Sequence, residues 1–321
     1  MRLCRFEYNA KIRLGLYYDD WVVDLKELFL AYSASSRMKL PIRAERFPAS
    51  ILAFLPPNRG RCEAARRLKA FYEENLERLS GGSITLDADK VRLLAPIPRP
   101  PKFFLLAGNY AEHIEESGGK AEEKRNTFPY VFMKPPTTTI INPGDPIRLP
   151  SISPEHIDWE VELGVVMGKR GKGILANEAL DYVAGYTIVN DVSDRQFRPN
   201  PHRKRRPRDE FFDWLHGKWH DTFAPIGPCV ASTEAIRDPQ NLHISLSVSG
   251  QKMQDSNTAR MIFSVAEIIE FISSFVTLEP GDIISTGTPS GIGAPKGRFL
   301  KPGEVVEAKI EGIGVLRNPV E

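Results

Sequence analysis

The chain has 321 residues, of which 41% are apolar and 26% are charged, and its formal net charge is +2. These values are typical of a soluble globular protein with one large and one smaller domain, and the charge points to no polyanionic partner. No apolar run approaches the ~18 residues of a membrane span.

The start of the chain has no secretory apolar segment. The three cysteines, Cys4, Cys62 and Cys229, are far apart and in no metal-binding spacing, which favours a reducing compartment. We therefore expect a cytoplasmic protein that does not associate with membranes.

The first third of the chain predicts a small α+β domain. Alternating side chains predict strands, and apolar positions at helical spacing predict helices. The expected elements are an antiparallel meander over residues 2–25 and helices over residues 25–32 and 61–79. Four prolines within residues 96–101 exclude regular sheet pairing there. We therefore place a domain boundary at this linker, with one domain over residues 1–95 and a second over residues 96–321.

The second domain is rich in predicted strands. They cover residues 103–107, 130–133, 159–166, 182–189, 243–248, 281–285, 305–310 and 314–316, and residues 264–275 form the clearest helix. Because these strands do not alternate with regular helices, we expect a β-rich α+β fold rather than a Rossmann or TIM-barrel architecture.

Glu160 and Glu162 are two positions apart in a predicted strand, and Asp191 ends the next predicted strand. Residues two apart on a strand project to the same face, where paired carboxylates near an apolar core repel each other unless a cation or proton lies between them. Three converging oxygen donors with no nearby cysteine suit a hard divalent ion such as Mg²⁺ or Mn²⁺. The alternative is an exposed strand with two solvated glutamates.

Two further groups offer acid–base or electrostatic chemistry. Lys218 lies between a glycine and aromatic residues, where an ammonium group can balance carboxylate or enolate charge. On a helix, His113 and Glu116 share one face and can hydrogen-bond, which makes His113 a candidate general base for water. The alternatives are a loop lysine in water and a surface histidine on a charged helix.

Two segments suggest anion binding. The glycine-rich turn at residues 286–293 follows a predicted strand, and its backbone N–H groups can bind a carboxylate. It lacks the pattern of a Walker loop or a dinucleotide fingerprint, so we exclude a nucleotide site. The basic run at residues 203–208 has no interleaved aromatic residues, so we expect a solvated loop rather than a nucleic-acid site, with attraction of an anionic substrate as the alternative.

Taken together, these segments resemble the fumarylacetoacetate hydrolase family over residues 102–320. In family order, the matching motifs are Gly108-Asn109-Tyr110 with His113, Phe132-Met133-Lys134-Pro135, Glu160-Val161-Glu162-Leu163, Asn190-Asp191-Val192-Ser193 with Arg195, Gly217-Lys218 with Asp221-Thr222-Phe223, and Gly287-Thr288-Pro289 with Gly291. The resemblance implies a mixed β-sandwich roll that assembles as a homodimer and acts on a small 2-oxo acid.

The resemblance also implies roles for single residues. The expected metal ligands are Glu160, Glu162 and Asp191, which would hold Mg²⁺ or Mn²⁺, with Ca²⁺ as a further candidate. The expected catalytic residues are His113, Glu116 and Lys218, and the expected substrate contacts include Arg195 and Thr288. Glu116 would lie on, and His113 directly before, residues 114–127, a segment that would close over the site.

The expected reaction is metal-dependent hydrolysis of a carbon–carbon bond in a 2,4-dioxo acid of the acylpyruvate or fumarylpyruvate type. The alternatives are decarboxylation, isomerisation or hydration of a related 2-oxo acid in aromatic or sugar-acid catabolism, and a non-catalytic binding protein stabilised by Ca²⁺. The chain departs from the family pattern in two places near the expected substrate mouth. Arg198 stands where many members carry Gln, and the Pro- and Arg-rich insert between Arg195 and Lys218 is longer.

Overall fold

A large sheet of twelve strands forms the framework of the protein in the computed structural model, which describes residues 1–35, 39–122 and 124–321. The strands of this sheet are β1 (Arg2–Tyr8), β2 (Lys11–Tyr18), β3 (Trp21–Asp24), β4 (Thr85–Asp87), β5 (Arg92–Leu94), β6 (Phe103–Ala107), β7 (Tyr130–Met133), β8 (Ile140–Ile141), β10 (Val161–Met167), β11 (Val183–Asn190), β13 (Ala224–Ser232) and β16 (Ile283–Ser285). They pair in the order β4-β3-β2-β1-β13-β11-β10-β16-β6-β7, with β5 beside β1 and β8 beside β13.

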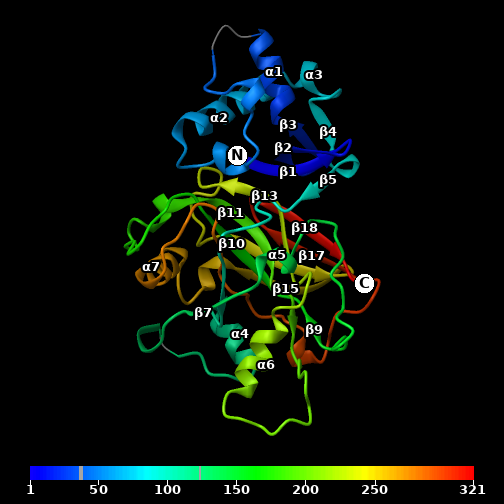
Figure 1. The fold of residues 1–321 in the computed structure, drawn as a ribbon, viewed down its shortest axis with the longest axis vertical. Coiled ribbons are helices and arrows are strands. Elements are labelled where there is room, and N and C mark those ends of the chain that lie inside the picture. The colour runs from blue at the N-terminus through cyan, green and yellow to red at the C-terminus, as the bar shows by residue number, and fades with distance from the viewer. Residues whose placement is uncertain (36–38, 123) are drawn as a thin grey trace.

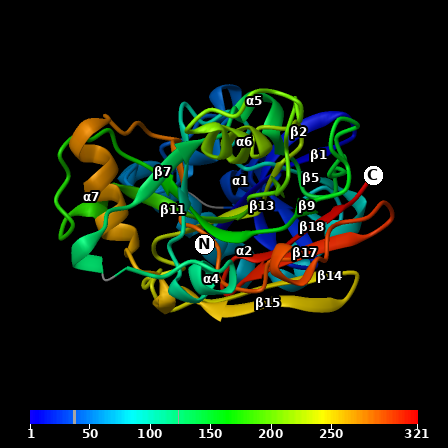
Figure 2. The same cartoon turned by 90° about the horizontal axis from the view of Figure 1, so that it is seen from below.

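A four-stranded sheet packs on one face of the large sheet (Figure 2). Its strands, in spatial order, are β15 (Gln251–Asn257), β14 (His243–Val248), β17 (Val305–Ile310) and β18 (Gly314–Pro319). Alternate residues of β10, including Val161 and Leu163, share one apolar cluster with Leu246 of β14 and Ala308 of β17. Two short strands, β9 (Ile157–Asp158) and β12 (Ser193–Asp194), pair separately. This arrangement confirms the expected β-rich α+β class.

Helices lie both at the ends of the molecule and beside its sheets (Figure 1). They are α1 (Leu25–Ser35), α2 (Arg59–Glu74), α3 (Leu76–Leu79), α4 (Ala111–Glu116), α5 (Pro136–Thr139), α6 (Asp209–Gly217) and α7 (Val265–Phe275). Leu28 of α1 and Leu68 of α2 pack with Leu16 of β2 in a second apolar cluster. Toward the opposite end lie α4 and α6, which Figure 2 shows on different sides of the molecule. No helix in the described part of the chain is long and apolar enough to cross a membrane.

The large sheet continues across the expected domain boundary. That boundary, after residue 95, falls between β5 and β6, but β1 pairs with β13 from the second part of the chain. The division into two domains stays a prediction.

Most expected elements are present, and the differences have local causes. The strand expected from residue 159 begins at Val161, because Trp159 N–H donates to the side chain of Asp158 and Glu160 N–H donates to the side chain of Asn190 instead of to a neighbouring strand. The sequence does not predict β13, in which prolines remove backbone donors. The structure accommodates it with a register shift against β11. The sequence predicts no element over residues 209–217 of the insert, where the structure has α6.

Candidate functional site

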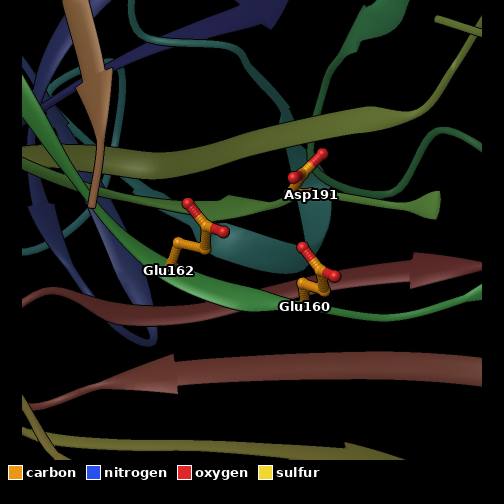
Figure 3. A group of neighbouring side chains, drawn as sticks. All are labelled: Glu160, Glu162 and Asp191. Atoms are coloured by element: carbon orange, nitrogen blue, oxygen red, sulfur yellow. The ribbon is translucent and has the colours of Figure 1, made fainter. Parts of the chain in front are cut away.

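Three buried carboxylates, those of Glu160, Glu162 and Asp191, point toward one another (Figure 3). One oxygen atom from each can be chosen so that all lie within 4.8 Å of one another. The pairing of β10 with β11 brings them together, because the N–H of Asp191 donates to the carbonyl of Glu160 over 2.8 Å. The interpretation of Glu160 and Glu162 as solvated surface residues is therefore wrong.

Positive side chains surround the carboxylates. Lys218 Nζ donates to Glu160 Oε2 over 2.7 Å and to Asp191 Oδ2 over 2.6 Å. Arg195 Nη2 lies 2.6 Å from Glu160 Oε1, and Lys134 pairs with the other oxygen of Asp191. A buried charge without a partner costs several kcal/mol, so these three cations make the burial of the carboxylates possible.

The two glutamates differ in their protonation. Burial opposes ionisation of Glu160, but Lys218 and Arg195 together outweigh burial and lower the pKa of Glu160 to about 2. Burial, followed by the negative charges of Asp191 and Glu160, raises the pKa of Glu162 well above its usual value. Glu162 is therefore the carboxylate whose charge the protein's own cations compensate least.

Glu162 is hydrogen-bonded through one oxygen only. Its Oε2 accepts from the hydroxyl of Ser285 and from the N–H of Gly287 over 3.0 Å. Its Oε1 is buried, and no donor reaches it among the residues that the structure describes. Leaving a buried acceptor unpaired costs about 1–3 kcal/mol. A hard cation bound by this oxygen and by the other two carboxylates would remove that cost, so the three residues form a candidate divalent-metal site.

The glycine-rich turn after β16 binds carboxylates of the protein itself. In addition to the bond from Gly287, Gly291 N–H donates to Glu116 Oε2 and Gly293 N–H donates to Asp158 Oδ1, each over 2.8 Å. A side chain at Gly291 would place its Cβ 2.1 Å from a backbone oxygen, so this close approach requires glycine. The N–H groups of the turn thus bind carboxylates, as the sequence predicts, but in this structure the carboxylates belong to the chain.

His113 and Glu116 form the expected pair on α4. His113 Nδ1 lies 3.1 Å from Glu116 Oε1, and the other oxygen of Glu116 is held by the turn. Because an ionised carboxylate only accepts hydrogen bonds, Nδ1 carries the proton and Nε2 is the nitrogen that can take another. After the larger effects of burial, Lys218 and Arg195, His113 also contributes to the lowered pKa of Glu160, so the imidazole lies within electrostatic reach of that carboxylate.

The segment expected to close over the site begins on α4 and continues as a loop with one 3₁₀ turn, Lys124–Asn126. Residue 123 of this segment lies outside the described residues. Its closing role stays a prediction.

Lys218 is fixed at the end of α6 by aromatic side chains. Its Nζ lies 5.5 Å from the ring centre of Phe132 and 5.8 Å from that of Trp214. Although burial opposes its charge, Asp191 and Glu160 raise the pKa of Lys218, so the ammonium form is stabilised. The alternative of a loop lysine in water is therefore wrong.

The two expected substrate contacts are both engaged with protein groups. Arg195 Nε lies 2.9 Å from Asp158 Oδ2, in addition to its ion pair at the cluster. The hydroxyl of Thr288 donates to the carbonyl of Val161 over 2.9 Å and accepts from Gln254 Nε2 over 2.8 Å. These contacts orient the backbone and side chains around the carboxylates, and a role in substrate binding stays a prediction for both residues.

Sequence reasoning assigned no role to three supporting residues, Lys134, Gln254 and Ser285. Lys134 is fully buried and donates to the carbonyls of Val192 over 2.8 Å and Phe223 over 2.5 Å. Burial lowers the pKa of Lys134 to about 8. The available signal was the lysine within an otherwise apolar family motif, whereas Gln254 lies on a polar strand that the sequence does not predict.

Comparison with known proteins places this site in a family. Residues 102–321 match the family model described as fumarylacetoacetate (FAA) hydrolase, C-terminal. The mitochondrial oxaloacetate tautomerase FAHD2A of Bos taurus is 43% identical over 237 residues, which cover 73% of this chain and 71% of that protein. An uncharacterised protein of Pyrococcus horikoshii is 46% identical over 222 residues, or 69% of this chain and 89% of that protein. The solved structure of a fumarylacetoacetate hydrolase from Exiguobacterium antarcticum is similar with a TM-score of 0.74 and 28% identity, covering 100% of this chain and 99% of the other.

Removing one carboxylate should weaken metal binding. We expect Glu160→Gln or Asp191→Asn to raise the dissociation constant for Mg²⁺ or Mn²⁺ about tenfold or more, because each change removes an anionic oxygen ligand. Isothermal titration calorimetry measures this affinity. Glu155→Gln, an exposed glutamate five positions before Glu160, is the matched control and should leave it unchanged. Unchanged affinity in both site variants would remove these residues from the metal site.

Proposed function

The chain belongs to the fumarylacetoacetate hydrolase family, and we propose that it is a divalent-metal-dependent enzyme that interconverts the keto and enol forms of oxaloacetate or a closely related 2-oxo acid. The observation that carries this proposal is the position of His113, which is held by Glu116 and lies within electrostatic reach of Glu160, one of the three buried carboxylates. The curated relative that is 43% identical to this chain and is named an oxaloacetate tautomerase supports the choice of substrate.

The residues that would hold the metal are Glu160, Glu162 and Asp191, with Mg²⁺ or Mn²⁺ as the candidate ions. When bound, such an ion supplies Lewis acidity that polarises the 2-oxo group and favours its enolate. The unpaired oxygen of Glu162 and the absence of a sulfur or nitrogen ligand in this cluster support a hard ion.

His113 carries the proton transfer in this proposal. Its Nε2 takes a proton from C3 of the keto form, and the hydrogen bond from Nδ1 to Glu116 stabilises the imidazolium that results. Lys218 adds positive charge beside the enolate oxygen. Transfer of the proton from Nε2 to that oxygen completes the enol and restores the neutral imidazole, so one C–H bond breaks, one O–H bond forms and no water is consumed.

Hydrolytic cleavage of a 2,4-dioxo acid is the second candidate reaction. The same pair favours it, because a histidine oriented by a carboxylate suits proton abstraction from water. Hydrolysis consumes one water molecule and yields two acids, whereas tautomerisation keeps the molecule intact. The similarity to a fumarylacetoacetate hydrolase at 28% identity supports hydrolysis less strongly than the curated relative supports tautomerisation.

Location and assembly stay predictions. The name of the curated relative places that protein in mitochondria, whereas we expected this chain to be cytoplasmic. A homodimer remains the expected assembly.

Product analysis distinguishes the two candidate reactions. We expect the metal-loaded protein to accelerate the conversion of enol-oxaloacetate, which is measured as a loss of enol absorbance. The kcat/KM of this reaction should exceed the kcat/KM for cleavage of acetylpyruvate or fumarylpyruvate. Nuclear magnetic resonance identifies the products. If pyruvate is released from either acylpyruvate with a higher kcat/KM than that of enol conversion, hydrolysis is the reaction of this protein and the proposal of tautomerisation is wrong.

His113→Ala should separate catalysis from metal binding. We expect the rate of enol conversion to fall by about 10²–10⁴-fold, the usual contribution of a general acid–base, while the affinity for Mg²⁺ stays near that of the unchanged protein. His243→Ala is a matched control, because His243 also pairs with a carboxylate but lies on the surface. A full rate in His113→Ala would exclude His113 as the base.

A further inference from the structure

The Pro- and Arg-rich insert between Arg195 and Lys218 lines a pocket that shares no residue with the carboxylate site. The pocket has a volume of about 540 Å³ and lies between the loop at residues 198–208 and the first half of α6. In Figure 1 this loop and helix form the end of the molecule opposite the N-terminal helices. The charged lining residues are Arg198, Arg203, Arg205, Arg206, Arg208, Asp209, Glu210 and Asp213.

The pocket carries excess positive charge. Its five arginines face three carboxylates, which leaves a net charge of +2, as large as that of the entire chain. Asp209 is paired with two of these arginines, since it lies 3.1 Å from Arg203 and 3.2 Å from Arg206. For Arg198 and Arg208, no carboxylate lies within ion-pair distance among the described residues. These two guanidinium groups are therefore free to bind an anion.

The dimensions and lining of the pocket indicate the class of ligand. Its volume falls within the range of about 300–1,000 Å³ that is usual for small-molecule sites, and exceeds what a single monatomic ion fills. Guanidinium groups form paired hydrogen bonds with phosphate and carboxylate oxygens alike. Phe211, whose side chain is exposed, supplies an apolar wall beside them.

We propose that this pocket binds a small molecule that carries at least two oxyanion groups, either phosphate or carboxylate, held by Arg198 and Arg208. This site goes beyond the proposed reaction and is separate from the metal-binding carboxylates. It is connected to them through α6. The ring of Trp214 lies 5.8 Å from that of Phe211 in the pocket and 5.8 Å from Lys218 Nζ at the catalytic end of the helix. The pocket therefore lies at the beginning of α6, and Lys218 directly follows the end of the same helix.

The test uses inorganic pyrophosphate and citrate as probes of the two oxyanion sources. Binding of each to the complete chain is measured by isothermal titration calorimetry after divalent ions are removed, because both probes chelate them. We expect at least one probe to bind, and the double variant Arg198→Ala/Arg208→Ala to raise its dissociation constant about tenfold or more. Tighter binding of pyrophosphate identifies a phosphorylated ligand, and tighter binding of citrate identifies a polycarboxylate.

The matched control is Arg61→Ala/Arg237→Ala, which removes the same charge from two exposed arginines outside the pocket. We expect the control to change the dissociation constant less than about twofold. All four side chains are exposed, so both double variants should fold, and circular dichroism checks this. No binding of either probe, or an equal loss in both double variants, would overturn the proposal.

Discussion

The arrangement of the site depends on one constraint, the mutual repulsion among three buried carboxylates. At a separation near 5 Å, two like charges repel by about 3–4 kcal/mol at the effective dielectric constant usual for proteins. Lys134, Arg195 and Lys218 offset that repulsion through ion pairs with Glu160 and Asp191. They leave Glu162 with a raised pKa and an unpaired oxygen. The three cations thus compensate part of the negative charge, and Glu162 still offers a position where a further cation would be favourable.

One backbone segment connects the metal site to the candidate base. The glycine-rich turn donates from Gly287 to Glu162 and from Gly291 to Glu116, and Glu116 in turn holds His113. The spacing of two amides in the same turn therefore sets where the imidazole lies relative to the three carboxylates. A fixed position of this kind is what the proposed proton transfer would require, and the close approach of the turn to neighbouring backbone explains why glycines are needed there.

Much of this arrangement is predictable from the sequence, for identifiable reasons. Strand parity places Glu160 and Glu162 on one side, and helical spacing pairs His113 with Glu116. The cations are harder to predict, because Lys218 reaches Glu160 across 58 residues of chain and only the family resemblance indicates its position. Prolines obscure β13, and α6 directly follows the basic run at residues 203–208, whose charge pattern indicates a loop. The reaction is the least predictable feature, since one histidine–glutamate pair serves both tautomerisation and hydrolysis.

Crystallography in the presence of Mn²⁺ tests the central claim most directly, because anomalous scattering locates the ion without assumptions about activity. The account predicts one strong peak bonded to an oxygen of each of Glu160, Glu162 and Asp191, at about 2.0–2.6 Å, the range of bonds from hard divalent ions to oxygen. A crystal soaked at saturating Mn²⁺ with no peak between these carboxylates, or with the ion bound only elsewhere, would contradict it.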